Sequence, residues 1–392
     1  MGRALRTPHS RIVEVEMSMQ LFIRTIAARP GAALALLLGL SLAPLALAES
    51  ATEAELFQRP ALHSELAPRS LMLSVARAGQ HLVAVGERGF ILRSEDDGQS
   101  WKQMPSPVSV TLSQVTFPSA SQGWAVGHAG VILHSTDGGL TWTSQLDGNQ
   151  AAQLALDAAS QTLTEYPGDD AQQRVDDARR LLEDGPDKPF LAVHFFNEQH
   201  GLVVGAYGLA FETLDGGQHW RSISERLDNP SALHLYGILD LQGTLFIAAE
   251  QGLLLRSTDQ GQHFRSVEIP ANGTLFGLLA STRNHLLAFG LRGKIYRSED
   301  QGDSWQTVAN TQPVTLTAGL TARDGSLLLV DETGRVLRSQ DDGRTFSVSP
   351  QGQTAALTGL AQAGDGRIVV SGARGLSQFF ISDSQRSSSR EQ

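Results

Sequence analysis

The sequence contains no cysteine among its 392 residues. The chain can therefore form no disulfide bond and can supply no thiolate to a zinc or iron–sulfur site. It also has no cysteine to which a lipid anchor could be attached. A chain of this length can nevertheless bury a sizeable hydrophobic core, so its fold does not need such cross-links.

Basic residues are the second shortage, with 31 lysines and arginines against 41 aspartates and glutamates, a net charge of −10. Residues 1–48 hold five of the arginines and two of the glutamates, so the remainder has 26 basic and 39 acidic residues and a net charge of −13. Nucleic-acid binding requires a basic footprint. The composition therefore argues against a nucleic-acid partner.

Long hydrophobic runs are also scarce, and the main one lies near the N-terminus. The apolar stretch Ala32–Ala43 follows Arg24 and Arg29 and precedes Ala46-Leu47-Ala48. It is too short for a membrane span, and this order of features is typical of a secretory signal peptide. We expect a signal peptide at 1–48, with the true start at Met17 or Met19, cleavage near Ala48 and a periplasmic mature chain.

The most informative feature present is an Asp-box, Ser/Thr-x-Asp-x-Gly-x-x-Trp/Phe, that occurs six times. The first residues of successive boxes are 41, 78, 44, 41 and 41 positions apart. A period of about 40–45 residues is typical of propeller blades. The boxes contain these aspartates and closing aromatic residues: Asp96 and Trp101, Asp137 and Trp142, Asp215 and Trp220, Asp259 and Phe264, Asp300 and Trp305, Asp341 and Phe346.

Each box belongs to a larger repeat of four short strands. In the first repeat, His81–Gly86 and Gly89–Ser94 are apolar strands joined by Glu87-Arg88, a tight turn of the kind that needs positive φ. An upstream run near Leu71–Val75 supplies the first strand, and Trp101 opens the fourth. We read the box as a structural turn in which the aspartate and hydroxyl bind backbone N–H groups and the aromatic ring packs between sheets. Calcium binding is not expected, because equivalent boxes are spread around a ring and calcium needs six to eight converging oxygens.

The repeats predict an all-β fold, a seven-bladed propeller of four-stranded antiparallel blades over residues 69–381. First strands start near Leu71, Val115, Ala192, Leu235, Leu275, Leu316 and Leu357. The seventh repeat has no box, and we expect its fourth strand to come from the N-terminal segment 49–68, although Pro60 and Pro68 disfavour a strand there. Residues 382–392 are expected to be a disordered tail.

The long 78-residue spacing indicates an insertion between blades two and three, at about 146–189. Ala151–Leu163 and Ala171–Leu182 have helical periodicity, and Pro167-Gly168 separates them. We expect a helical hairpin. Insertions in repeat folds often serve binding, and a purely decorative insertion is an equally open interpretation.

The turns between second and third strands are candidates for binding, because they lie on the face opposite the Asp-boxes. Arg88, Arg292 and Arg374 occupy equivalent turn positions there, and Tyr207 takes that position in blade three. The planar guanidinium of arginine binds carboxylates well, and tyrosine is favoured at protein–protein interfaces. Lys294 and Arg335 lie just beyond their turns. The alternative interpretation is that these are solvated turn residues.

The blade consensus Gly-x-x-Gly-x-(Ile/Leu/Tyr)-Arg-Ser-x-Asp-x-Gly-x-(Ser/Thr)-Trp resembles the photosystem II assembly and stability factor family, whose members carry BNR (Asp-box) repeats. Gly290–Trp305 and Gly86–Trp101 match best, and the resemblance covers most of Arg69–Phe380. It implies a propeller that binds membrane protein subunits in photosynthesis, and it includes the family's turn arginines. The helical insertion and the missing lipobox cysteine are departures from that pattern.

We therefore expect a non-catalytic periplasmic scaffold that binds a membrane protein or envelope complex subunit, uses no cofactor or metal and is a monomer. An Asp-box glycoside hydrolase similar to sialidases or xyloglucanases is one alternative, and an accessory subunit of an envelope transporter is another. Glycosidases need two carboxylates facing one sugar bond. Candidates for such carboxylates are Glu87, Glu250, Asp331 and Glu332, but no pair among them stands out.

Overall fold

The computed structural model describes residues 57, 59–350 and 352–381. The chain divides into two units, Met1–Glu49 and Ser50–Gln392, and every described residue belongs to the second. The expected signal peptide at 1–48 and the expected tail at 382–392 lie outside the described residues, as does most of 49–58. The following description concerns the second unit alone.

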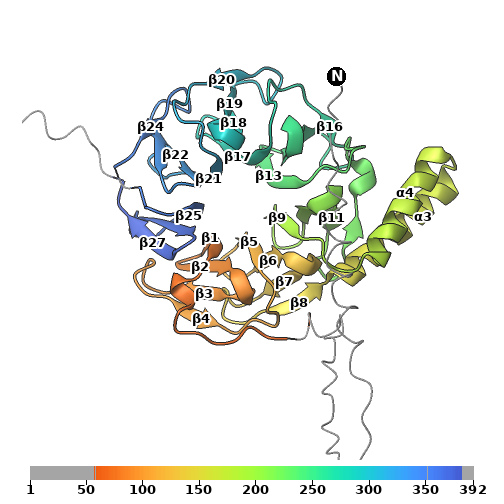
Figure 1. Cartoon of the computed structure of the whole chain (residues 1–392), viewed down its shortest axis with the longest axis horizontal. Coiled ribbons are helices and arrows are strands. Elements are labelled where there is room, and N and C mark those ends of the chain that lie inside the picture. The colour runs from red at the N-terminus through yellow and green to blue at the C-terminus, as the bar shows by residue number, and fades with distance from the viewer. Residues whose placement is uncertain (1–56, 58, 351, 382–392) are drawn as a thin grey trace, which may run out of the picture. The chain divides into compact units, whose positions relative to one another are not determined.

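Seven antiparallel sheets form a closed ring (Figure 1), which confirms the predicted propeller. The first strand of each sheet is innermost and the last is outermost. Blades one to three contain β1 (Met72–Ala78), β2 (His81–Gly86), β3 (Ile91–Ser94) and β4 (Lys102–Met104); β5 (Leu112–Thr116), β6 (Gly123–Gly127), β7 (Ile132–Ser135) and β8 (Thr143–Leu146); and β9 (Phe190–Phe195), β10 (Gly201–Gly205), β11 (Ala210–Thr213) and β12 (Arg221–Ser222).

The remaining four blades repeat this order, except that the last has three strands. They contain β13 (Leu235–Leu241), β14 (Thr244–Ala249), β15 (Leu254–Ser257) and β16 (Arg265–Ser266); β17 (Leu275–Ala280), β18 (Leu286–Gly290), β19 (Ile295–Ser298) and β20 (Gln306–Val308); β21 (Leu316–Thr321), β22 (Leu327–Asp331), β23 (Val336–Ser339) and β24 (Ser347–Val348); and β25 (Leu357–Gln362), β26 (Ile368–Gly372) and β27 (Gly375–Phe379).

The core consists of apolar layers between neighbouring blades. Second strands are buried over nearly their whole length, because each is covered by adjacent sheets on both faces. Strand-three arginines add a polar link at several of these junctions. Arg93 Nε donates to the Gly138 carbonyl at 3.0 Å, and Arg297 Nε donates to the Asp342 carbonyl at 2.7 Å, in each case in the next blade.

The expected closing strand is wrong within the described residues. No strand pairs with the outer edge of β27, and 59–66 instead follow blade one. The Ala61 N–H donates to the Ser106 carbonyl at 3.2 Å, and Gln103 Nε2 donates to the Leu62 carbonyl at 2.9 Å. Pro60 and Pro68 have no N–H to give to a sheet ladder, whereas the Gln103 side chain satisfies this irregular backbone.

The ring closes by packing between blades seven and one. Met72 and Leu82 of blade one share a buried cluster with Ala361 and Val369 of blade seven. Thr358 Oγ1 also donates to the Met72 carbonyl at 2.6 Å. Closure among the described residues therefore depends on contacts between inner strands and on no exchanged strand.

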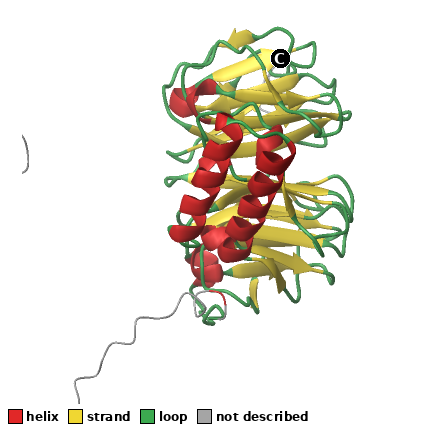
Figure 2. Cartoon of the chain, turned by 90° about the vertical axis from the view of Figure 1, so that its right-hand side faces the viewer, coloured by secondary structure: helices red, strands yellow, loops and turns green. Residues whose placement is uncertain are grey.

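The insertion is a helical hairpin, as predicted, formed by α3 (Gly148–Glu165) and α4 (Asp169–Glu183). Asp147 begins α3 with a capping box: its side chain accepts from the Gln150 N–H at 3.0 Å, and the Gln150 side chain accepts from the Asp147 N–H. The helices leave the ring on the turn side and lie side by side along its rim (Figure 2), with α3 contacting the outer strand β12. The hairpin therefore packs beside blade three.

Candidate functional site

Turns between second and third strands have the same left-handed geometry in the first five blades. In blade one, Arg88 has φ 56° and ψ 27°, Gly89 has φ 71°, and the Phe90 N–H donates to the Glu87 carbonyl at 3.0 Å. This is a type I′ turn, whose central pair is Arg88-Gly89, one residue later than the pair predicted from sequence. The same left-handed position holds Ala129, Tyr207, Gln251 and Arg292 in blades two to five.

One further hydrogen bond fixes the register of all seven turns. The N–H of the first turn residue donates to the carbonyl of the residue just before the innermost strand, at 2.8–3.1 Å. The acceptors are Leu71, Thr111, Pro189, His234, Thr274, Thr315 and Ala356. These turns therefore lie midway along the radius of one face, which we call the turn face, and the Asp-boxes lie on the opposite face.

The structure places the three predicted turn arginines in exposed positions, but their turns differ. Arg88 and Arg292 are left-handed central residues and have no ion-pair partner in the described part of the chain. Arg374 is exposed in a shorter turn, where φ is positive only at Gly375, and its guanidinium donates to Thr354 Oγ1 at 3.3 Å. Arg88 and Arg374 belong to the neighbouring blades one and seven, whereas Arg292 lies in blade five, two blades away from Arg374.

Blade five holds an open groove of about 700 Å³ on the turn face. Three segments form its walls: Asn272–Leu275 before and at the start of β17, the turn Leu291–Lys294, and Thr307–Thr311 with Pro313 at and after β20. Arg292 and Lys294 both line it and are both exposed. Sequence reasoning singled out these two cations but missed the groove, because its walls come from three separate segments.

The groove combines positive charge with neutral hydrogen-bonding groups. Lys294, like Arg292, has no ion-pair partner among the described residues. Thr274 and Asn310 add polar atoms, and Asn310 Nδ2 holds the turn by donating to the Gly293 carbonyl at 2.9 Å. An arrangement of this kind can bind carboxylates, because neither cation has to leave an ion pair within the protein before it binds a carboxylate of a partner.

The other two predicted binding residues have different environments. Arg335 Nε is bound to the buried Asp331 carboxylate at 2.6 Å, so its charge already has a partner inside the protein. Tyr207 is 56% exposed, and Lys188 lies over its ring at 5.4 Å from the centroid. Tyr207 is therefore available for contacts, whereas Arg335 mainly stabilises its own turn.

The carboxylates considered for a hydrolase have backbone partners. Glu87, Glu250 and Glu332 each accept from a backbone N–H at the start of an inner strand, at 3.0–3.2 Å. Asp331 is fully buried and accepts from the Thr333 and Arg335 backbone N–H groups. The three glutamates lie in blades one, four and six, and this hydrogen bond holds each of them at its own turn.

Sialidases are glycosidases that use a tyrosine as the nucleophile. Tyr236 is a candidate for that role, because it lies beside the Glu250 carboxylate. Burial raises the pKa of Tyr236, and the neighbouring Glu250 charge raises it further. The phenol therefore stays protonated at neutral pH. This environment opposes the formation of a phenolate nucleophile.

The Asp-boxes on the other face form closed local networks. In the first box, Asp96 Oδ1 accepts from the Ser94 hydroxyl and the Ser100 N–H, both at 2.8 Å, and Asp96 Oδ2 accepts from the Ser100 hydroxyl at 2.6 Å. The Gly98 N–H donates to Ser94 Oγ at 2.8 Å. Gly98 has φ 86°, and a Cβ there would meet Val369 of blade seven at 2.8 Å. The box thus shapes a turn and docks it on the preceding blade.

These hydrogen bonds hold the box aspartates in the charged form. The Ser100 hydroxyl and then its backbone N–H hold the pKa of Asp96 at about 2, and Ser304 does the same for the pKa of Asp300. No cluster of three or more histidine, aspartate or glutamate side chains suited to a metal ion occurs in the described ranges. The geometry is that of a turn stabiliser.

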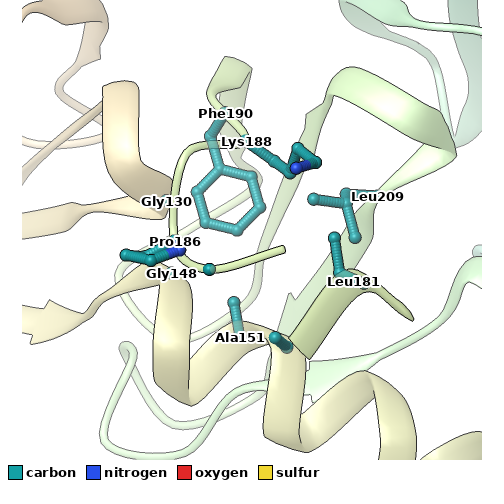
Figure 3. A pocket seen from close by; sticks show the side chains of 10 residues that line it. Gly130, Gly148, Ala151, Leu181, Pro186, Lys188, Phe190 and Leu209 are labelled. Atoms are coloured by element: carbon teal, nitrogen blue, oxygen red, sulfur yellow. The ribbon is translucent and has the colours of Figure 1, made fainter. Parts of the chain in front are cut away.

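The base of the helical hairpin forms a second feature near the turn face (Figure 3). A small cavity of about 10 Å³ lies between Gly130, Gly148 and Leu181, with Phe190 and Leu209 on its wall. This space is close to that of a single water molecule. Ala151 and Leu181 close the junction, so the hairpin is tightly docked where it meets blades two and three.

No helix in the described residues is long and apolar enough to cross a membrane.

Comparisons with known proteins agree with this architecture. The family model described as "Photosynthesis system II assembly factor YCF48" matches residues 51–165 and 180–388, which leaves out most of α4. The curated photosystem II assembly lipoprotein Ycf48 of Synechococcus sp. (strain CC9902) is 35% identical over 101 residues, 24% of this chain and 30% of that relative. The chain thus matches less than a third of that relative's length.

Solved structures show the same fold at low sequence identity. A structure described as YCF48 bound to D1 peptide is 16% identical, with a TM-score of 0.59 over 83% of this chain and 99% of that one. YCF48 from Cyanidioschyzon merolae is 18% identical, with a TM-score of 0.58 over 80% and 97%. A streptogramin B lyase is 13% identical, with a TM-score of 0.60 over 79% and 93%, so the fold alone does not decide function. Because the family model covers most of the propeller, the chain belongs to the photosystem II assembly factor YCF48 family.

Proposed function

We propose that this protein is a non-catalytic, exported assembly factor that binds an anionic segment of a membrane protein or envelope complex subunit through its turn face. The observation that carries the proposal is the blade-five groove, where Arg292 and Lys294 are exposed and have no ion-pair partner among the described residues. On a chain with a net charge of −10, unpaired cations beside a groove favour a partner that brings carboxylates.

The family supports the kind of partner. One solved relative is described as bound to a D1 peptide, and the curated relative is described as a photosystem II assembly lipoprotein. Both are statements about those proteins. We extend to this chain the general mode, recognition of a segment of a membrane protein, and leave the identity of that protein to experiment.

Export to the periplasm is part of the proposal and rests on the sequence before Glu49. A non-catalytic role is favoured by the carboxylates of the turn face, since Glu87, Glu250 and Glu332 accept backbone N–H groups in three different blades. A scaffold needs none of these groups to change protonation state during its work.

The proposal is tested by reversing the charge of the groove. The full chain and the Arg292→Glu/Lys294→Glu variant are used to capture proteins from detergent-solubilised membranes of the source organism. We expect the variant to lose a membrane protein that the unchanged chain captures, with the same thermal stability, because both side chains are exposed.

Arg283→Glu is the matched control, since Arg283 is also exposed and belongs to blade five but lies in the β17–β18 turn on the Asp-box face. This variant should retain capture. Equal capture by all three proteins, or loss only in Arg283→Glu, would show that the turn face is not the docking face.

A further inference from the structure

Four aromatic rings lie next to one another on blades three, four and five. Ring centroids of Tyr207 and His234 are 4.9 Å apart, those of His234 and Tyr236 are 6.5 Å apart, and those of Tyr236 and Phe276 are 5.0 Å apart. We call Tyr207, His234, Tyr236 and Phe276 the aromatic ledge. Tyr207 is 56% exposed and the other three are partly exposed, so the ledge presents ring surface to solvent.

The propeller repeat itself does not require these rings. Tyr236 and Phe276 each occupy the second position of an innermost strand, two residues after the carbonyl that fixes the turn. The seven blades carry at this position Leu73, Ser113, Leu191, Tyr236, Phe276, Thr317 and Thr358. Five blades thus form the same strand with small or aliphatic side chains, and the aromatic pair is particular to blades four and five.

Tyr207 is also placed against its backbone preference. It has φ 54° and ψ 33° in the type I′ turn, a left-handed conformation that is uncommon for a bulky residue. Its hydrogen bond from the backbone N–H to His234 Nδ1, at 3.3 Å, fixes the turn beside the next ring. A strained and exposed aromatic side chain of this kind is a reason to look for a ligand.

Charged groups lie at the two ends of the ledge. Lys188, which follows the helical hairpin, lies over the Tyr207 ring, and its ammonium group is paired with Asp184 and Asp187. At the other end, Phe276 directly follows Thr274 and Leu275, which line the blade-five groove together with Arg292 and Lys294. The surface is therefore aromatic in the middle, where the Glu250 carboxylate lies beside His234 at 3.4 Å, and its unpaired cations lie at the blade-five end.

From this arrangement we infer that the aromatic ledge and the blade-five groove form one binding track for an extended peptide segment, in which a large apolar or aromatic side chain lies close to carboxylates. The inference rests on the proposed function and adds the class of side chain that the partner must supply. Aromatic side chains of the track stack on that apolar residue, while Arg292 and Lys294 bind the carboxylates.

A selection from a displayed library of random dodecapeptides tests this track. The full chain is the bait, and the Tyr207→Ala/Phe276→Ala variant is selected in parallel, with Tyr207→Ala alone as a second variant whose exposed site leaves folding intact. The full chain should enrich peptides that have aspartate or glutamate close to phenylalanine, tyrosine, tryptophan or leucine. The ledge variants should enrich the acidic residues alone.

The contribution of the apolar residue to the binding affinity is then measured with a selected peptide and its twin, which has alanine in place of that residue. We expect the twin to bind the full chain about tenfold more weakly, and this difference to disappear in the ledge variants. Leu73→Ala, at the equivalent strand position of blade one, is the control and should keep the difference.

The outcomes separate the two proposals. Enrichment of acidic peptides without an apolar residue, or equal binding of the twins, would overturn the role of the ledge and leave the cationic groove standing. Selection of peptides with no excess of acidic residues would overturn the proposed function itself.

Discussion

Asp300 shows how one side chain serves both the turn and the blade. Its Oδ1 accepts from the Ser298 hydroxyl and the Ser304 N–H, both at 2.8 Å, and Oδ2 accepts from the Ser304 hydroxyl at 2.5 Å. Three donors converge on one carboxylate, and five other boxes repeat the arrangement. The residue type was therefore predictable from sequence, because the turn chemistry is local to eight residues.

Replacing Asp300 with alanine should destabilise the protein by about 1–3 kcal/mol, because the turn donors lose their acceptor. The free energy of unfolding in urea measures this loss. Glu268→Ala is the control, since Glu268 is an exposed carboxylate without a hydrogen-bond partner among the described residues, and this change should affect stability little. A loss of partner capture by folded Asp300→Ala protein would contradict the structural role.

The box aspartates also predict how stability depends on acid. The pKa values of Asp96 and Asp300 are about 2 in the folded protein, below the ordinary value of 3.8. The folded pKa is depressed, so the stabilisation is complete above about pH 4 and is lost as the pH falls toward 2. Urea unfolding at a series of pH values should show this decline, and it should be shallower in Asp300→Asn. If the free energy of unfolding fell with pH just as steeply in Asp300→Asn, the role of the Asp300 carboxylate in acid stability would be contradicted.

At the scale of elements, strands and turns followed from the sequence where the signal was local. The Gly-x-x-Gly pattern gave the hairpins, and helical periodicity gave α3 and α4. The closing strand was wrong within the described residues, because the path of 59–66 is decided by contacts with Gln103 and Ser106 about 40 positions away. The blade-five groove was not predicted for a similar reason, since no local sequence pattern indicates that Asn272, Arg292 and Asn310 line the same groove.

The helical hairpin gives a prediction about docking. Ala151 is 3% exposed and faces the junction of blades two and three, so Ala151→Arg would bury an unpaired guanidinium there. We expect the hairpin to undock while the ring stays folded, with faster proteolytic cleavage inside 148–185. Gln153→Arg, at an exposed position of the same helix, should be cleaved at the original rate. Equal cleavage of both variants would mean that this junction does not hold the hairpin.

At the scale of the whole described unit, the two faces of the ring carry different kinds of residues. One face carries six Asp-boxes whose aspartates are satisfied by their own turns. The other carries exposed turn residues, of which Arg292 and Lys294 border a groove and Arg88 is free of ion pairs within the described part. The helical hairpin starts on this second side and packs on the rim. This division between satisfied and unpaired groups supports the proposed binding function of the turn face.

Site-specific photo-crosslinking tests that central claim most directly. A photoreactive amino acid is placed at Thr311, an exposed residue on the rim of the blade-five groove, or at Thr282, an exposed residue in the β17–β18 turn of the same blade on the opposite face. After irradiation in cells, the account predicts a crosslink from position 311 to one membrane protein and none from position 282. The same crosslink from position 282, with none from 311, would contradict the account.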